Sequence, residues 1–479
     1  MDPLQSSSGA LQYANSQTEV LGATSTGKLE RKASRLQRYC GRLEAGSQRT
    51  SMFGLVSTSL GCAFLSTPTV FANLGLILGS ATLIFTGFAT CLSLQVLARV
   101  ADTTSSDTYG GMVKKSIGGL AAVFSDVIFV IYGIFTALGC YIFLKQLIPQ
   151  FAKNIGLPQA WVSSDLAFLS AFTVFCIAPL SLLKTLSALR YISLLSVASS
   201  IVAILILCLV TPAKYAEMVH HIADAPAGSA EALPPDFWWW PNSKKPWIPE
   251  LPLAVAICLF ALTNHVNLFT TRGELSRPEP QRLNKVIARA SAIQTFIYWL
   301  FGVLCFLALG PPCDEKVPSA AWPSCTPVNV LASPRFHDAA GTMAQLLMII
   351  IVTASIVLNL GAGRRAFFQL LERCQGSGVS QITCEESQGS LRNGVRDNHG
   401  RPCSESLLVH TLSTLVSVFV VMLAGAYLNS IENVLSVLGG FCVASYGSLI
   451  PLFAMLRLRQ MGTLDIQPRH RCMLMSAIL

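Results

Sequence analysis

The stretch from Ser51 to Ala98, SMFGLVSTSLGCAFLSTPTVFANLGLILGSATLIFTGFATCLSLQVLA, contains no Asp, Glu, Lys or Arg. Similar apolar stretches recur to about residue 456, and only 12% of the 479 residues are charged. Because a helix needs roughly 20 apolar residues to cross the hydrocarbon core of a bilayer, this pattern predicts a protein that crosses a membrane many times. It argues against a water-soluble globular protein of this size.

Ten spans are expected, and all of them are expected to be helices. An open sheet would leave backbone groups unpaired in hydrocarbon, and the alternating pattern of a membrane barrel is absent. The expected fold class is therefore an all-α polytopic membrane protein. The spans are placed at about 52–72, 75–98, 120–144, 166–183, 190–211, 251–271, 288–309, 340–362, 406–427 and 433–456.

The ten expected spans divide into two sets of five. An odd number in each set makes the second set enter the membrane from the opposite face, which is the arrangement of an inverted repeat. Each set is then expected to begin with an interrupted helix. The first span contains SLGCAFLSTP, from Ser59 to Pro68, and the sixth contains FALTNHVN, from Phe260 to Asn267. Matching interruptions in the two halves point to a central binding site.

Both interruptions offer groups that hold a small zwitterion. Unwound backbone presents N–H groups to a carboxylate and carbonyls to a cation, and the polar cluster of the sixth span would be costly in lipid. For the first span, the alternative is that the small residues serve close helix packing. For the sixth span, two alternatives stay open: His265 is neutral and bonded to a carbonyl on a neighbouring helix, or His265 carries protons. The expected substrate-binding residues are Ser59, Leu60, Gly61, Cys62, Ala63, Thr263, Asn264, His265 and Asn267.

Basic residues are distributed unevenly between the predicted loops. With the N-terminus in the cytosol, most of the 34 Lys and Arg residues fall on the cytosolic side, which is the positive-inside bias that sets topology. This bias accounts for the net charge of +9, so no nucleic-acid partner is expected. The plasma membrane and a vacuolar or lysosomal membrane both fit, because both keep the cytosol on the same side.

Hydrophilic segments flank and interrupt one transmembrane domain. Residues 1–50 lack the pattern of a signal peptide and are expected to form a disordered basic cytosolic tail. The FWWWP run at Phe237–Pro241 is interpreted as an interfacial aromatic anchor, with a lid over a binding vestibule as the alternative. The expected divisions are a transmembrane domain at 51–457, external loops at 212–250 and 310–338, a cytosolic linker at 373–405, and a segment at 458–479 that is a short cytosolic tail or the remnant of an eleventh helix.

Further polar residues are candidates for coupling, gating or cross-linking. Asp126 is the only acid inside the third span, so it is a candidate for coupling or gating. Arg272 and Glu274 end the sixth span, where an ion-pair gate and a plain interface charge both stay open. Cys313 and Cys325 share one external loop and are expected to be able to form a disulfide. No Cys or His spacing indicates a metal site.

Several ordered motifs resemble the amino acid/auxin permease family. FALTNHVNLFTTRGEL, from Phe260 to Leu275, is similar to the family's sixth-helix motif, in which Phe-Ala, His and Glu-Leu fall at the same spacing. The run Gly61–Pro68 resembles the family's Gly-Ser-Gly-Ile-Leu-Gly-Leu-Pro pattern. TYGGMVKKSIG, APLSLLKTLSALRYISLLSV and LSVLGGFCVASYGSLIP also agree. The resemblance covers about 51–457 and is greatest to neutral amino acid transporters of the system A/N type and to vacuolar relatives.

The resemblance implies a leucine-transporter-type fold of five plus five helices, with helices 1 and 6 broken around an amino acid. In sodium-using members a cation lies between helices 1 and 8, and the matching positions here are Ser57 and Thr353. Those relatives carry Asn at the position of Ser57, and Ala63 replaces a Gly of the family pattern. These departures leave coupling to H+ or Na+ open, and no other cofactor is implied.

The leading interpretation is a secondary transporter that moves amino acids, neutral ones favoured, through a lipid bilayer by alternating access. The alternative is an amino-acid sensor that uses the same site and signals through its cytosolic tail. An enzyme is not expected, because no nucleophile–base pair or metal cluster is visible at membrane depth. An ATP-driven pump is disfavoured by the absence of a P-loop pattern. The sequence does not indicate an oligomeric state.

Overall fold

The computed structural model describes residues 47–157, 165–182, 186–223, 239–240, 247–275, 279–310, 329–333, 336–374, 407–428 and 431–462, and these contain helices but no strand. The helices are α2 (Gln48–Ser59), α3 (Cys62–Thr103), α4 (Tyr109–Ser116), α5 (Gly119–Asn154), α7 (Asp165–Phe172), η1 (Thr173–Ile177), α8 (Ala178–Ser181), α9 (Leu186–Ala223), α10 (Leu251–Ala261), α11 (His265–Glu274), α12 (Pro280–Leu309), η3 (Val330–Ala332), α13 (Ala339–Cys374), α15 (Leu407–Tyr427), α16 (Ile431–Ser436), η6 (Val437–Leu449) and α17 (Ile450–Gln460).

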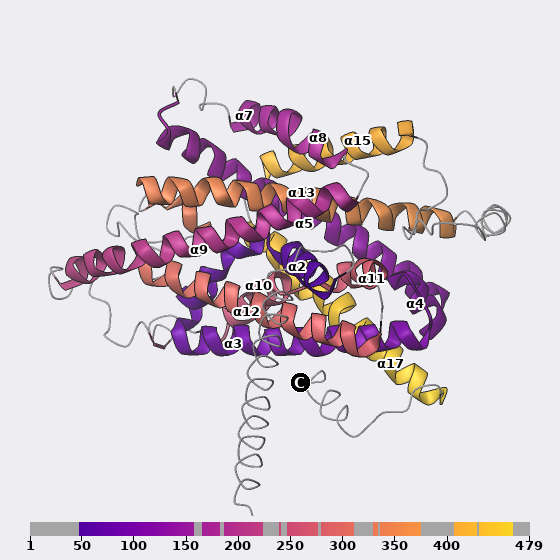
Figure 1. Ribbon diagram of the computed structural model, residues 1–479. Coiled ribbons are helices and arrows are strands. Elements are labelled where there is room, and N and C mark those ends of the chain that lie inside the picture. The colour runs from indigo at the N-terminus through magenta and orange to yellow at the C-terminus, as the bar shows by residue number, and fades with distance from the viewer. Residues whose placement is uncertain are drawn as a thin grey trace, which may run out of the picture.

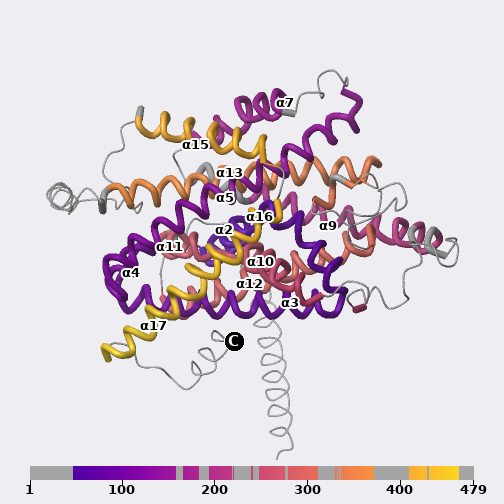
Figure 2. Tube along the Cα trace, turned by 180° about the vertical axis from the view of Figure 1, so that it is seen from behind, coloured from indigo at the N-terminus to yellow at the C-terminus, as the bar shows by residue number. Residues whose placement is uncertain are grey.

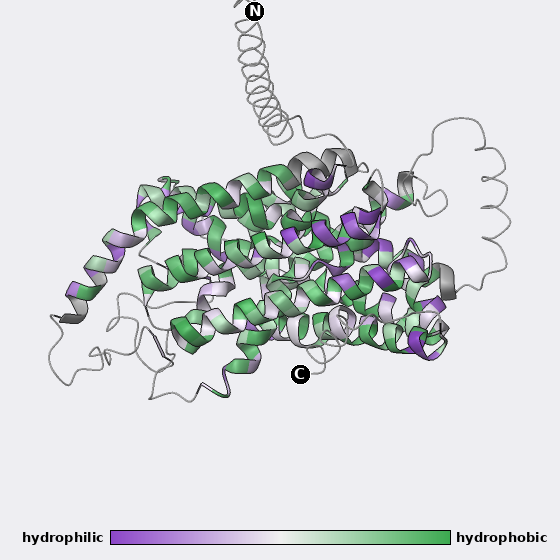
Figure 3. Cartoon of the chain, turned by 60° about the horizontal axis from the view of Figure 1, so that its bottom comes forward, coloured by the Kyte–Doolittle hydropathy of each residue, from purple (hydrophilic) through white to green (hydrophobic). Residues whose placement is uncertain are grey.

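Eight helical stretches among the described residues are long and apolar enough to cross a membrane. Figure 1 shows the long helices running side by side across the molecule, with α5 and α13 adjacent and α3 along one edge. Apolar residues cover most of the bundle and hydrophilic ones gather toward the helix ends (Figure 3). The protein is therefore a multi-pass membrane protein. The eight stretches are Cys62–Thr103, Gly119–Asn154, Leu194–Glu217, Leu251–Gly273, Pro280–Leu309, Ala339–Leu371, Val409–Tyr427 and Ile431–Gln460.

The difference between these eight stretches and the ten expected spans lies in the first half of the chain. The expected second span and the later part of the first both fall in α3, which bends at Gly75, where φ is 73°. The expected span at 166–183 corresponds to the shorter apolar stretch Leu166–Ser181, which includes the π-helical turn η1.

The short helix α2 lies inside the bundle (Figures 1 and 2), where it packs against α9, α11, α12 and α13. Around it, α3 packs along α12 and α10, and α5 packs along α13. These helices bury their contact faces and expose apolar side chains elsewhere, such as Phe85, Phe88 and Leu209. This exposure suits a molecule whose surrounding solvent is lipid.

Several expected features lie outside the described residues. These are the tail up to residue 46, the Cys313–Cys325 pair, most of the 373–405 linker and the chain after residue 462. Trp239 and Trp240 of the FWWWP run are described. The backbone N–H of Ile77 donates to the Trp239 carbonyl at 3.2 Å, so this part of the run lies against the bend of α3.

Candidate functional site

The first break separates α2 from α3. Helix α2 ends at Ser59, Leu60 takes an extended conformation (φ −67°, ψ 113°), and α3 begins at Cys62 after Gly61 (φ −166°, ψ −148°). All four are buried. A Cβ on Gly61 would lie 3.1 Å from Cβ of Ser355 on α13, so a residue without a side chain lets α13 approach the break. The first N–H groups of α3 have no carbonyl four residues back within the helix, and that of Phe64 donates to the Gly61 carbonyl at 3.1 Å.

The second break separates α10 from α11. Helix α10 ends at Ala261, and α11 begins at His265 after the non-helical residues Leu262, Thr263 and Asn264. Thr263, Asn264 and His265 are buried. Asn267 lies within the first turn of α11, where its backbone N–H donates to the Asn264 carbonyl at 3.1 Å. Its side chain is only partly buried, unlike the other polar residues of this cluster.

The two breaks lie against each other, although about 200 residues separate them in the chain. The Thr58 hydroxyl contacts Oδ1 of Asn264 at 3.4 Å. Gln294 of α12 contacts both breaks: its amide nitrogen donates to Oγ of Ser59 at 2.6 Å, and its amide oxygen accepts from Asn264 at 2.7 Å. The Tyr298 hydroxyl donates to the Ser59 carbonyl at 2.7 Å. The described structure therefore brings the expected substrate-binding residues of both spans together.

His265 has a hydrogen-bond partner for each ring nitrogen. Nδ1 lies 3.2 Å from Oγ1 of Thr263, and Nε2 lies 3.1 Å from Oγ of Ser93 on α3. Ser93 in turn donates to the Gly447 carbonyl in η6, and Thr263 lies 3.3 Å from the hydroxyl of Tyr446 in the same π-helix. His265 is thus fixed in an uncharged network, and a ligand would reach either nitrogen only by displacing Ser93 or Thr263.

Three helices supply small polar groups beside the first break. The thiol of Cys62, the first residue of α3, faces the thiol of Cys140 on α5. Cys140 also contacts Ser355, whose hydroxyl lies 3.1 Å from Nδ2 of Asn359 one turn further along α13. These groups are uncharged, and Asp126 is the one Asp, Glu, Lys or Arg among the described residues that are buried. The surroundings of the breaks are therefore polar and electrically neutral.

The three coupling candidates do not form one cluster. Ser57 is buried in α2 and donates to the Gly54 carbonyl at 2.9 Å. Thr353 is buried in α13, and its Oγ1 has no hydrogen-bond partner among the described residues. Helices α2 and α13 contact each other, but no recorded hydrogen bond joins these two side chains. Asp126 is buried in the first third of α5.

Arg272 at the end of α11 has a facing partner. Its guanidinium forms a 2.9 Å ion pair with Asp102 near the end of α3 and donates to the Ser106 carbonyl at 2.7 Å. Both side chains are partly exposed. The side chain of Glu274 falls outside the described ones. Arg272 is therefore placed in an interhelical ion pair.

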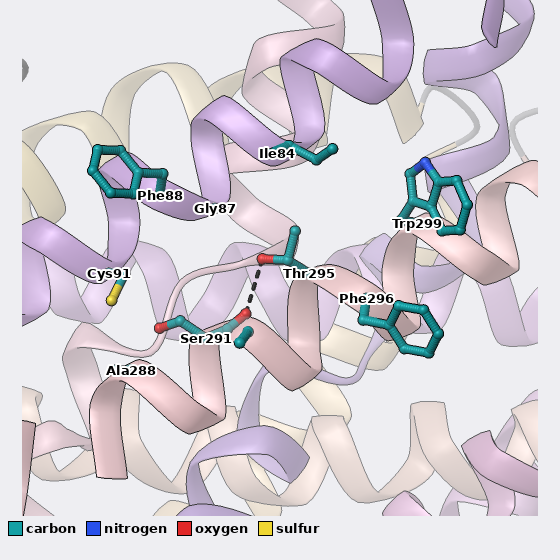
Figure 4. Close-up of a pocket in the computed structure, with 10 residues that line it drawn as sticks. Ile84, Gly87, Phe88, Cys91, Ala288, Ser291, Thr295, Phe296 and Trp299 are labelled. Carbon is teal, nitrogen blue, oxygen red and sulfur yellow. Dashed lines mark hydrogen bonds between the residues drawn. The ribbon is translucent and has the colours of Figure 1, made fainter. Parts of the chain in front are cut away.

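A separate groove of about 540 Å³ lies between α3 and α12. Figure 4 shows Phe88 and Ile84 of α3 on one side and Phe296 and Trp299 of α12 on the other. None of the residues at the two breaks lines it. Its lining is mostly apolar, and it lies along the middle of two spans, so it is set apart from the polar cluster.

Three residues of this network were not expected from the sequence: Gln294, Ser93 and Tyr446. Gln294 did carry a signal, because it is the single amide side chain in the apolar stretch 288–309 and a buried amide needs partners. Ser93 carried none, because serine is common in membrane helices and usually bonds to its own backbone. Tyr446 carried none, because an aromatic residue in an apolar stretch is expected to pack by its ring.

Comparison with known proteins identifies the family. Residues 44–475 match the family described as "Transmembrane amino acid transporter protein". The chain belongs to this family. The resemblance to the amino acid/auxin permeases is thereby confirmed, and the family is one of transporters and not of enzymes.

Curated relatives include proteins of vacuolar and sodium-coupled types. The chain is 22% identical over 433 residues to "Vacuolar amino acid transporter 6" of Saccharomyces cerevisiae, covering 85% of this chain and 88% of that protein. It is 24% identical over 409 residues to "Sodium-coupled neutral amino acid transporter 7" of Xenopus laevis, covering 83% and 78%. The match to "Vacuolar amino acid transporter 5" of Schizosaccharomyces pombe is 26% identical and spans just over half of each protein, 54% and 58%.

Among solved structures, a Na+-coupled sialic acid symporter in a substrate-bound outward-open state is similar, with a TM-score of 0.50 and 12% sequence identity. The likeness covers 87% of this chain and 79% of that one. At this identity the similarity shows a shared fold alone.

Proposed function

We propose that this member of the transmembrane amino acid transporter family moves neutral amino acids across a membrane by alternating access. Two sets of five spans, each beginning with a broken helix, surround one central site. The observation that carries the proposal is the meeting of two helix breaks at Ser59 and Asn264, joined through Gln294, inside a protein of a transporter family.

The breaks provide complementary groups for a zwitterion. Helices α3 and α11 begin at the breaks, so their N–H groups carry partial positive charge and suit a carboxylate. Helices α2 and α10 end there, so their last carbonyls carry partial negative charge and suit an ammonium group. An amino acid oriented in this way satisfies both pairs of helix ends at once.

Neutral substrates are favoured by the charge inventory. Asp126 is the one Asp, Glu, Lys or Arg among the described buried residues, and it is not among the residues recorded at the breaks. A charged substrate side chain would lose its hydration without gaining a partner of opposite charge, which costs several kcal/mol or more. The sodium-coupled relative is named for neutral amino acids, in keeping with this proposal.

The proposal also concerns the identity of the coupling ion, the orientation of the chain in the bilayer and the membrane in which the protein resides. The N-terminus is placed in the cytosol by the positive-inside bias. The named relatives include vacuolar and sodium-coupled proteins, so H+ and Na+ are both to be tested, with Ser57 and Thr353 as the positions for a cation. The sensor alternative gains no support from the family or from these relatives.

The test is uptake into proteoliposomes that contain the purified protein. Radiolabelled alanine, glutamine and leucine are compared with lysine and glutamate, each with an imposed Na+ gradient, an H+ gradient or neither. We expect accumulation of at least one neutral amino acid and of neither charged one. If no amino acid accumulates or exchanges in folded protein, the proposal is wrong.

A pair of histidine substitutions tests the site. His265→Ala is expected to reduce uptake at least tenfold, because it removes the link between Thr263 and Ser93 beside the second break. The matched control is His410→Ala on α15, a buried histidine that contacts Arg364 away from the breaks. Equal losses of uptake in the two variants, at equal thermal stability, would mean that the site is misplaced.

A further inference from the structure

Gln294 lies on α12, a helix that is unbroken and contributes to neither break. Its side chain is fully buried, with 0% exposure. From Ala290 to Leu309 the helix α12 carries no charged residue, and a buried amide without partners would cost about 1–3 kcal/mol. Position 294 therefore requires a side chain that forms hydrogen bonds, which an apolar residue of the same size cannot do.

Each end of the Gln294 amide contacts a different break. On the α2 side, Nε2 donates to the Leu55 carbonyl at 3.1 Å and to Oγ of Ser59 at 2.6 Å. On the other side, Nδ2 of Asn264 donates to Oε1 of Gln294 at 2.7 Å. If the Asn264 amide is turned over, the two amides remain 2.7 Å apart and Asn264 itself donates to the Leu55 carbonyl at 3.0 Å.

The last turn of α2 requires hydrogen-bond donors from outside. The final four carbonyls of a helix have no partner within it, and they carry the negative end of the helix dipole. Tyr298, one turn beyond Gln294 on α12, donates to the Ser59 carbonyl at 2.7 Å. Helix α12 thus fixes the end of α2 at two points, and at one of them it also fixes Asn264.

We propose that Gln294 is a positioning residue that holds the two broken helices in register, so that their backbone groups present one joint binding site. This rests on the proposed transport of a neutral amino acid through the breaks. Gln294 acts through Ser59 and Asn264 and does not itself bind substrate. Losing it lets the end of α2 and the 262–264 segment shift separately, which weakens substrate affinity by more than the accompanying loss of stability accounts for.

The experiment compares two leucine substitutions at fully buried glutamines. Gln345 on α13 is also 0% exposed and donates to a backbone carbonyl, that of Leu331 at 2.9 Å, but it lies away from the breaks. Uptake of the neutral amino acid that wild type accumulates fastest is measured over a range of concentrations. Gln294→Leu is expected to raise the half-saturation concentration at least tenfold, and Gln345→Leu to leave it within twofold at a similar loss of thermal stability.

Two further variants keep the test decisive. Tyr298→Phe removes one hydroxyl and is expected to raise the half-saturation concentration about threefold in folded protein, which provides a result even if Gln294→Leu does not fold. In the double variant Asn264→Ala with Gln294→Leu, the effects should be less than additive, because both substitutions break the same contact.

Several outcomes would overturn the proposal. One is that Gln294→Leu has the same half-saturation concentration as wild type. If Gln294→Leu does not fold, the same result in Tyr298→Phe overturns the proposal. Others are an equal rise in Gln345→Leu and full additivity with Asn264→Ala. Failure of the underlying transport proposal is seen separately, because wild-type protein would then take up none of the amino acids.

Discussion

At the scale of single residues, Ser93 shows how the site fixes its only histidine. Its one proton goes to the Gly447 carbonyl, so it accepts a hydrogen bond from Nε2 of His265, and one hydroxyl joins α3, α11 and η6. A hydroxyl that satisfies two buried groups is hard to replace, since an unsatisfied buried donor or acceptor costs about 1–3 kcal/mol.

Ser93→Ala is therefore expected to lower the thermal stability of the purified protein and to raise the half-saturation concentration for uptake several-fold. Ser200→Ala on α9 is the control, because Ser200 has the same side chain and is more deeply buried than the partly buried Ser93, while its hydroxyl donates to the Ser196 carbonyl of its own helix. The prediction is contradicted if the two variants melt and transport alike.

Gly75 is the second residue with a specific backbone task. Its φ of 73° is one that residues with a side chain rarely adopt, and a Cβ there would lie 2.7 Å from the backbone carbon of Trp240. Gly75→Ala is expected to destabilise the protein by more than about 1 kcal/mol, seen as a lower melting temperature in detergent. Gly54→Ala in α2, where nothing lies within 4 Å of the added Cβ, should be neutral or slightly stabilising. Equal melting temperatures would refute this interpretation.

At the scale of elements, the crossing of α5 and α13 depends on two glycines. A Cβ on Gly133 would lie 2.6 Å from Cα of Gly363 and 3.1 Å from the Asn359 carbonyl, so the two backbones are in direct contact. Gly133→Ala is expected to force the helices apart at a cost of about 1–3 kcal/mol. Gly361→Ala, which meets nothing within 4 Å, is the matched control on the same pair of helices, and thermal melting compares them.

The π-helix η6 is an element that hydropathy alone does not reveal. Its carbonyls at Tyr446 and Gly447 accept hydrogen bonds from Tyr109, at 2.6 Å, and from Ser93. Burial raises the pKa of the Tyr109 phenol well above its ordinary value, so this hydroxyl remains a donor throughout the physiological pH range. Side-chain donors from α4 and α3 thus take part in holding the irregular backbone that places Tyr446 beside Thr263.

The ion pair between Arg272 and Asp102 joins the ends of α11 and α3. Because both side chains are partly exposed, its contribution to stability is expected to be below about 1 kcal/mol. If the pair works as a gate, Arg272→Gln, Asp102→Asn and the double variant should all change the maximal uptake rate by the same factor at nearly unchanged melting temperature. Additive effects in this double-mutant cycle would contradict a shared gating role.

At the scale of the whole molecule, hydrophobic residues predominate along the bundle (Figure 3), and the polar residues Ser59, Thr263, Asn264 and His265 are buried at the two breaks. The polar residues that line the breaks are satisfied by one another, through Gln294 on one side and Ser93 on the other. A bound substrate must therefore replace some of the hydrogen bonds between these residues with hydrogen bonds to itself. On the proposed function, a compact zwitterion supplies these replacement hydrogen bonds, and its departure leaves no charged side chain unpaired at the breaks.

The sequence by itself determined that the protein is helical and crosses the membrane many times, and it indicated the family. The interruptions it predicted at Ser59–Pro68 and Phe260–Asn267 include the helix ends at Ser59 and Ala261. Hydropathy and helix-breaking residues are local signals, because each depends on residues that are close together in the chain. They can therefore be recognised in a single segment of sequence. Only the tertiary structure decided that Gln294 joins Ser59 to Asn264, that Ser93 fixes His265 and that Arg272 faces Asp102. These partners come from helices distant in the chain, and their contact depends on where the helices cross, which no local pattern encodes.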